Sequence, residues 1–143
     1  MDFSFADMEP GEPRLLTEIF PVLVELRTHL TAGSFAALYA AGYPQGLRFT
    51  GGYAGGSCLG VAGWRIMDST FCLRKLYVDD LVTSAAARST GVGRALIAEL
   101  ARRGKAAGCH VLDLDSGVQR ADAHRFYFRE RMSIAAYHFA LEL

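Results

Sequence analysis

The sequence predicts an α/β domain of the α+β kind, in which helices flank a twisted sheet, and three observations support this class. Apolar residues recur at helical spacing over residues 15–30. The segment Phe71–Thr83 is apolar on both faces, as expected for a central strand that is covered on both sides. A glycine-containing turn, residues 88–93, then joins that strand to an amphipathic helix. Strand and helix patterns therefore alternate along one chain.

Length and composition indicate one domain over residues 1–143. The chain has 143 residues, of which 51% are hydrophobic and 21% charged, enough to bury a core but too few for two comfortable domains. Its formal net charge is +0, so no field attracts nucleic acid or an anionic membrane, and neither is an expected partner. Three widely spaced cysteines favour free thiols in a reducing compartment over a disulfide frame or a zinc site.

The N-terminal residues carry no sign of export. Acidic residues stand where a signal peptide needs basic ones, and no apolar run approaches the roughly 18 residues of a membrane span. The expected protein is soluble and cytoplasmic.

The first elements are a short strand at residues 3–5 and a helix over residues 15–30. Pro21 interrupts that helix, so it predicts either a kink or a helix that begins at the proline. Thr31 and Ser34 are alternative N-caps for a second helix.

From Leu47 onward the sequence pattern is typical of strands. The Gly55-Gly56 pair is typical of a two-residue hairpin turn, with Cys58–Ile66 as its second arm, and no phosphate-loop pattern accompanies the glycines. Further along, the patterns predict the following elements: a strand at 71–83, a helix at 90–108, a strand at 110–115, a helix at 121–131 and a closing strand at 133–143. The total is about six to seven strands and about four helices.

The turn Arg88-Ser89-Thr90-Gly91-Val92-Gly93 is built to hold an anion. Its two glycines let the backbone turn tightly, and the helix that follows begins with unpaired N–H groups at a positive dipole end. Arg88 and Arg94 add positive charge on either side. A phosphate or pyrophosphate is the natural ligand of such a turn.

A dinucleotide-binding interpretation of this turn fails on its details. The acids Asp113 and Asp115 lie about where a ribose partner would stand. However, Leu96 stands at the third glycine position, and about seven residues separate the preceding strand from Gly91, where the fingerprint allows almost none.

Three segments in the right order resemble the GNAT superfamily of acetyl-CoA-dependent N-acetyltransferases. They are Val82-Thr83, then Arg88-Ser89-Thr90-Gly91-Val92-Gly93, which fits the family's Arg/Gln-x-x-Gly-x-Gly/Ala motif, and Ala123-His124-Arg125-Phe126-Tyr127. The resemblance covers nearly the whole chain. It implies a mixed, mostly antiparallel sheet that splays at its centre between the strands ending at Thr83 and Asp115.

The resemblance also implies a site for acetyl-CoA, with no metal. The backbone of Leu81, Val82 and Thr83 would bond the pantetheine arm as an extra strand, and the N–H groups of Ser89 to Arg94 would hold the pyrophosphate. The cofactor-binding candidates are Leu81, Val82, Thr83, Arg88, Ser89, Thr90, Gly91, Val92, Gly93, Arg94, Arg120 and Phe126.

Acetyl transfer to an amine needs a base, an oxyanion donor and an acid. A backbone N–H at about Val82 is the expected donor, and Tyr127 is the expected acid, the role of its counterpart in many family members. Asp80 and Asp115 are the favoured bases, because neighbouring carboxylates raise one another's pKa values.

Several alternatives stay open for these acids. By strand alternation Asp79 and Asp80 lie on opposite faces, but a bulge would swap that assignment. The carboxylates could instead bind a cationic amine, or form salt bridges; the arginines considered are Arg74, Arg120 and Arg125. His110, Asp113, Asp115 and His124 have no spacing that indicates a metal site.

The expected acceptor is a small-molecule amine, and the clustered aspartates favour a cationic one. The expected enzyme is thus an acyltransferase. A protein N-terminus or lysine as acceptor, and a non-catalytic acyl-CoA-binding sensor, are the alternatives. The N-terminal helices are expected to shape the acceptor side, with Arg27, His29, Phe35, Tyr39 and Tyr43. A homodimer is possible, since dimers are common in the family.

Overall fold

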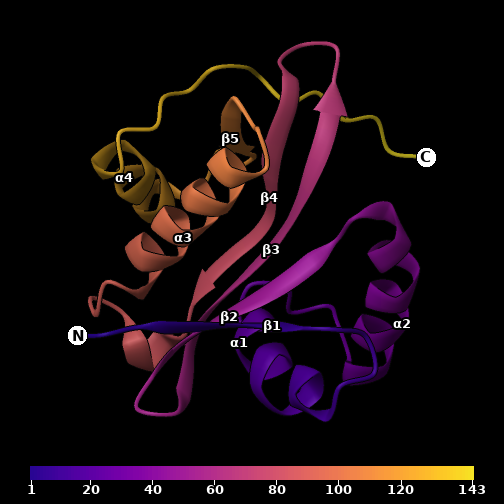
Figure 1. Cartoon of the computed structure of the whole chain (residues 1–143), viewed down its shortest axis with the longest axis vertical. Helices are drawn as coiled ribbons and strands as arrows, with labels where there is room; N and C mark the ends of the chain where they lie inside the picture. Colours follow the sequence, from indigo (N-terminus) through magenta and orange to yellow (C-terminus); the bar gives the residue numbers. More distant parts are fainter. The chain divides into compact units, whose positions relative to one another are not determined.

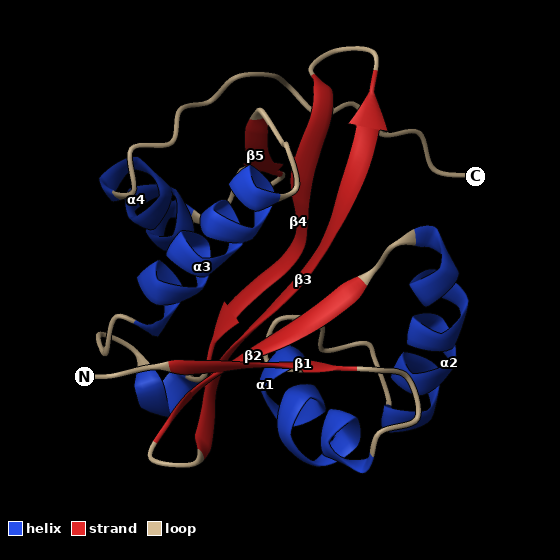
Figure 2. Cartoon of the chain, in the orientation of Figure 1, coloured by secondary structure: helices blue, strands red, loops and turns tan.

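The computed structural model describes all 143 residues, which divide into two compact units, Met1–Asp113 and Leu114–Leu143. Five strands form one sheet in the order β1-β2-β3-β4-β5, so neighbours along the chain are neighbours in the sheet. The strands are β1 (Ser4–Met8), β2 (Arg48–Ala54), β3 (Ser57–Ser69), β4 (Leu73–Thr83) and β5 (Val111–Leu114). The pairs from β1 to β4 are antiparallel, which confirms the α+β class. Figures 1 and 2 show these elements.

The sheet has five strands where the sequence predicted about six or seven. The closing strand predicted at residues 133–143 is wrong, because no strand forms there, and Tyr137, Phe139 and Leu141 are exposed. An alternating pattern indicates that a segment suits a strand, but a strand also needs a neighbour whose backbone pairs with it.

The first predicted helix is much shorter than its apolar pattern. A π-helical turn, η1 (Leu15–Ile19), leads into α1 (Phe20–Leu23), with Pro21 in the first turn of α1. Proline has no N–H to donate and clashes with the preceding turn, so the chain widens before it. Single hydrogen-bonded turns follow α1, so Arg27 lies outside the helix.

The second helix, α2 (Ala32–Gly42), begins at the predicted cap. The Thr31 hydroxyl accepts the Ser34 N–H, and the Ser34 hydroxyl accepts the Thr31 N–H, which completes a capping box. Gly55 and Gly56 both have positive φ, of 59° and 80°, and turn β2 into β3 as predicted.

Helices cover both faces of the sheet in the first unit, with α1 and α2 on one side and α3 (Val92–Ala106) on the other (Figure 1). Glycines permit the close approach of α3. A Cβ on Gly52 would lie 3.0 Å from Val92, and one on Gly60 would lie 2.9 Å from Leu96. The main buried cluster lies on the opposite face, where Phe35 of α2 packs edge-on against Phe49 of β2. The glycine-rich segment thus serves helix packing.

A polar network ties α3 to the sheet. Arg103 donates to Asp7 Oδ1 at 2.7 Å and to Glu99 at 2.7 Å, while the buried Thr50 hydroxyl donates to Asp7 and accepts from Trp64 Nε1. The second unit contains α4 (Ala121–Arg129) and the segment after it. None of the helices combines the length and apolarity that crossing a bilayer requires.

Candidate active site

The predicted anion-binding turn precedes α3 in the first unit. Ser89 and Gly91 have positive φ of 67° and 91°, and Gly91 is the residue from which α3 starts. No side chain caps the helix, so its first N–H groups are left to other acceptors. Alternating backbone handedness of this kind forms a concave nest of N–H groups. The geometry therefore fits a phosphate or pyrophosphate.

The side chains around this turn also favour binding of a phosphate or pyrophosphate. The Thr90 hydroxyl donates to the Ala87 carbonyl at 2.6 Å, which holds the turn from within. Arg88 and Arg94 are exposed on either side of the glycine. The turn thus combines N–H donors with positive charge, as an anionic cofactor requires.

β4 is longer than β5, so the last residues of β4 have no neighbouring strand on that side. The four-residue β5 lies beside the beginning of β4, where the His110 N–H donates to the Arg74 carbonyl at 2.9 Å. A strand of that length cannot reach Leu81–Thr83, at the other end of β4. The backbone at that end is available on one side, as the resemblance implied.

The ladder with β3 determines which backbone groups point to this open edge. Ser84 donates to Leu59 at 2.8 Å, and because hydrogen-bonded and non-bonded pairs alternate, Val82 also bonds to β3, through Val61. The backbone groups of Leu81 and Thr83 point the other way. The register therefore moves the expected N–H donor from Val82 to Leu81.

A β-bulge in β4 brings two acids to one face. Gly63 pairs with Asp80, but the next residue of β3, Trp64, pairs with Val78, so Asp79 is an extra residue. Simple alternation would have put Asp79 and Asp80 on opposite faces. Instead both line the same pocket.

The Asp80 carboxylate is largely buried, bonds to Arg27 and lies close to Gly63. Its Oδ1 accepts from Arg27 Nε at 2.7 Å, and its Oδ2 lies where a Cβ on Gly63 would be only 2.6 Å away. Burial raises the pKa of Asp80 above its usual range, while Arg27 opposes that shift. A carboxylate with a raised pKa is suited to accept a proton.

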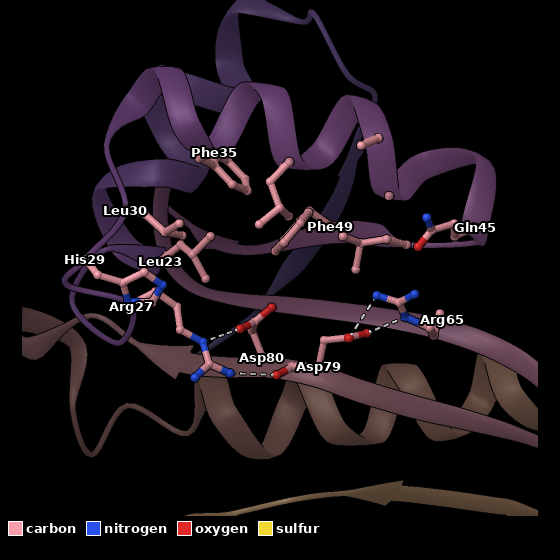
Figure 3. A pocket seen from close by; sticks show the side chains of 14 residues that line it. Leu23, Arg27, His29, Leu30, Phe35, Gln45, Phe49, Arg65, Asp79 and Asp80 are labelled. Atoms are coloured by element: carbon pink, nitrogen blue, oxygen red, sulfur yellow. Dashed lines mark hydrogen bonds and ion pairs between the residues drawn. The ribbon is translucent and has the colours of Figure 1, made fainter. Parts of the chain in front are cut away.

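Asp79 is fully engaged by a second arginine. Arg65 of β3 donates from two nitrogens to the two Asp79 oxygens, both at 3.0 Å, and Arg27 donates to the Asp79 carbonyl at 3.0 Å. The two guanidinium groups flank the two carboxylates along β4 (Figure 3). Asp79 and Arg65 therefore form an ion pair with a structural role in the lining of the pocket.

These pairs line one side of a cavity of about 540 Å³ between β4 and the N-terminal helices. The ring of Phe35 lies across the cavity from them (Figure 3), and Leu38 of α2 also lines it. His29 and Gln45 also line it. Of the five residues expected on this side, Arg27, His29 and Phe35 line the pocket, whereas Tyr39 and Tyr43 do not.

Among the residues that surround the acids, the sequence analysis missed Arg65, which lines the pocket, and Gly63, which lies beside Asp80. Arg65 had no local pattern to mark it, because its partner Asp79 reaches it only through the bulge. Gly63 was one of many glycines. Two of the salt-bridge partners considered for the acids were wrong: Arg74 pairs with Asp68, and Arg125 pairs with Asp122.

The second unit holds the remaining candidates. Tyr127 lies on α4 beside Phe126, whose ring centroid is 5.4 Å away, and burial raises the pKa of its phenol. His124, one turn earlier, has its Nε2 2.9 Å from the Gly117 carbonyl, so it fastens the preceding loop. Arg120 is exposed just before the helix.

Asp115 differs from Asp80 in its surroundings. It is exposed and lies 3.6 Å from Nδ1 of His138 in the same unit. It also follows β5, which ends at Leu114, and so is outside the predicted strand. No group of three or more His, Cys, Asp or Glu side chains is placed to hold a metal ion.

Comparisons with known proteins agree with this geometry. Residues 14–132 match the model of the Acetyltransferase (GNAT) family. Over 111 residues the chain is 32% identical to the uncharacterized N-acetyltransferase YhdJ of Bacillus subtilis (strain 168), covering 77% of this chain and 78% of that one.

Two solved structures share the fold. One is the aminoglycoside N-acetyltransferase AAC(6')-Iy in complex with CoA, with a TM-score of 0.83 and 15% identity over 99% of this chain and 95% of that chain. The other is the ribosomal-protein-alanine N-acetyltransferase of Brucella melitensis biovar Abortus 2308, with a TM-score of 0.82 and 16% identity over 99% and 100%.

Proposed function

The chain belongs to the acetyltransferase (GNAT) family, and from that premise we propose that it transfers an acetyl group from acetyl-CoA to the primary amine of a small molecule. The observation that carries the proposal is the position of Asp80. This buried carboxylate lies in the pocket and immediately precedes Leu81, whose N–H points to the open edge of β4. A proton acceptor and an N–H donor thus stand next to each other in the chain.

The residues that would hold acetyl-CoA are those of the open edge and the turn. Leu81 and Thr83 offer backbone groups to the pantetheine amides, and the first N–H groups of α3 donate to the pyrophosphate. Arg88 and Arg94 add charge, and Arg120 and Phe126 of the second unit are further candidates. Acetyl-CoA supplies the acetyl group as a thioester, whose carbon–sulfur bond breaks as the acceptor nitrogen bonds to the acetyl carbon.

Three groups of the chain perform the proton and charge chemistry. The amine arrives as a small ammonium ion, and Asp80 takes one proton from it to make it nucleophilic, later releasing that proton to solvent. The Leu81 N–H stabilises the negative charge that develops on the carbonyl oxygen. Tyr127 protonates the departing sulfur, and its phenolate then takes the second proton from the nitrogen. The sum is an amide, free CoA and one proton.

Thiol release measured with acetyl-CoA and a panel of primary amines tests the proposal. Asp80→Asn is expected to lower kcat/KM by about 10²–10⁴-fold, the usual contribution of a general base, while calorimetric binding of acetyl-CoA stays unchanged. The matched control is Asp68→Asn, which changes an exposed aspartate on the β3–β4 hairpin. If Asp115→Asn abolished activity and Asp80→Asn did not, Asp115 would be the base.

The acid is tested in the same assay. Tyr127→Phe is expected to slow turnover by a similar factor, and Tyr137→Phe, which changes an exposed tyrosine of the same unit, serves as its control. Acetyl-CoA binding without thiol release from any amine would replace the proposed enzyme by an acyl-CoA-binding protein.

A further inference from the structure

The pocket at Asp80 has a charge pattern that restricts what can occupy it. Asp79 and Asp80 are the only acidic residues among those that line it, and each already bonds to a guanidinium group. Two negative charges are thus matched by two positive ones, from Arg27 and Arg65. The pocket has no surplus of negative charge with which to attract a polycation.

The rest of the lining is mostly apolar, with His29 and Gln45 as its other polar side chains. Six large apolar side chains from α1, α2, β2 and the loops before α2 and β2 line the pocket: Leu23, Leu30, Phe35, Leu38, Leu47 and Phe49. Leu23, Leu30, Phe35 and Phe49 lie above the ion pairs in Figure 3. Several of these belong to the buried core, so the wall is rigid and does not rearrange at small cost. An alkyl or aromatic group placed against it would be removed from water on contact.

We propose, on the basis of the function proposed above, that the acceptor is a monoamine with an apolar or aromatic body. Its single ammonium group reaches Asp80, and its body packs against the wall formed by α1, α2 and β2. A second ammonium group on the acceptor would meet Arg27 or Arg65, whose like charges repel it. Selection against polycations therefore comes from the same arginines that hold the two acids.

The volume is consistent with this class. A cavity of about 540 Å³ falls within the range of pockets that bind compact organic ligands. A phenyl or hexyl chain with one amine fits such a space and brings only one positive charge, which lies beside Asp80. A polyamine or an aminoglycoside would bury several ammonium and hydroxyl groups against hydrocarbon, which is unfavourable unless each is paired.

The test compares matched amines with the wild-type chain and acetyl-CoA. The monoamines are hexylamine and phenethylamine, and the polycations are spermidine and neamine. We expect kcat/KM from thiol release to be about tenfold or more higher for the monoamines, since hydrophobic pockets discriminate by such factors. A preference for spermidine or neamine would overturn the inference but leave the proposed acetyl transfer intact.

A substitution in the wall sharpens the comparison. Leu38→Asp puts an unpaired carboxylate on the apolar side and is expected to lower kcat/KM for hexylamine about tenfold and to raise it for spermidine. Leu38 is 47% exposed, so the variant is expected to fold; Ala41→Asp, on the same helix and also lining the pocket, is a second version of the change. Leu16→Asp, at a leucine 38% exposed and outside the pocket, should leave the preference unchanged.

Absence of thiol release with every amine would contradict the proposed function, and binding then decides the inference by itself. Calorimetric titration of phenethylamine and spermidine into the chain should show tighter binding of phenethylamine. Leu38→Asp should reverse that order, and Leu16→Asp should not. Equal or tighter binding of spermidine to the wild-type chain would overturn the inference.

Discussion

Arg27 Nε donates to Asp80 Oδ1 over 2.7 Å and so joins a turn after α1 to the bulge of β4, 53 residues away in the chain. The bond opposes the effect of burial on the Asp80 carboxyl, whose pKa is nevertheless raised. Arg27 therefore determines the pH range in which Asp80 is ionised. It is a positioning residue for the proposed base, since it acts through Asp80.

Replacing Arg27 by methionine should move the acid limb of the pH profile to higher pH. A carboxylate with a raised pKa accepts protons only above that pKa, so kcat/KM falls as the pH drops through it, and losing Arg27 raises the pKa further. A hydrogen bond to a charged group contributes about 1.5–3 kcal/mol, so kcat/KM on the acid limb should fall about tenfold or more. The measurement is a pH profile of kcat/KM.

Arg27→Lys is the informative control, because it keeps the positive charge without the planar geometry. Its acid limb should lie between those of the wild type and Arg27→Met. An unchanged limb in Arg27→Met would mean that the pair does not influence the proton acceptor.

Gly63→Ala should destabilise the fold and weaken the site together. The new methyl would lie 2.6 Å from Asp80 Oδ2 and 2.7 Å from the Phe49 ring, so the carboxylate or the ring must move. Overpacking of this kind costs about 1–3 kcal/mol, measurable by urea denaturation. In Gly33→Ala the new methyl meets nothing within 4 Å, and a gain of up to about 1 kcal/mol is expected in α2. Equal stability of the two variants would contradict the packing at Asp80.

Gly91→Glu should abolish the anion site at the start of α3. Position 91 has a φ of 91°, and the new carboxylate would oppose a bound phosphate. Like charges brought together cost several kcal/mol, so acetyl-CoA should bind at least about tenfold more weakly in a calorimetric titration.

Gly11→Glu separates backbone strain from charge. Gly11 has nearly the same φ, 88°, and also has open space where a Cβ would go. Both variants should lose about 1–2 kcal/mol of stability, but only Gly91→Glu should lose acetyl-CoA binding. Loss of binding in both would show that strain, and not the site, is responsible.

Glu99 should contribute to resistance against acid unfolding. Hydrogen bonds from Arg102 and then Arg103 lower its pKa from 4.5 to about 2. A carboxyl with a lowered pKa stabilises the fold above its ordinary pKa, and this contribution is lost as the pH falls from about 4.5 toward 2. In Glu99→Gln the free energy of unfolding should therefore fall less steeply between pH 4.5 and 2. Unfolding followed by circular dichroism at a series of pH values measures this. Glu142→Gln, an exposed change near the C-terminus, should leave the curve as it is.

Local chemistry was enough to predict several elements of the fold. The Thr31 cap bonds to a residue three positions away, and the Gly55-Gly56 turn needs only its own positive φ values. The turn at Gly91 is of the same kind, because the backbone freedom and the start of α3 are encoded within a few residues. Interactions between residues a few positions apart can be predicted from the sequence, because both partners lie in the same short segment.

Helix ends and strand pairing were predicted less well. The apolar spacing over residues 15–30 continued past Leu23, where the helix ends, because spacing records which face is buried and not where the backbone leaves the helix. Residues 133–143 alternate apolar and polar side chains but do not pair with another strand, for a related reason. Whether a segment becomes a strand depends on a partner that its own pattern does not specify.

By itself the sequence determined the class of the fold, the anion-binding turn and the identity of the acids in β4. Only the tertiary structure decided how those acids are used. The register of β3 against β4 makes Asp79 the extra residue of a bulge, which turns it to the same face as Asp80. The fold then brings Arg27 and Arg65 against them from distant positions. Such pairings depend on register and long-range packing, which no spacing along a single chain encodes.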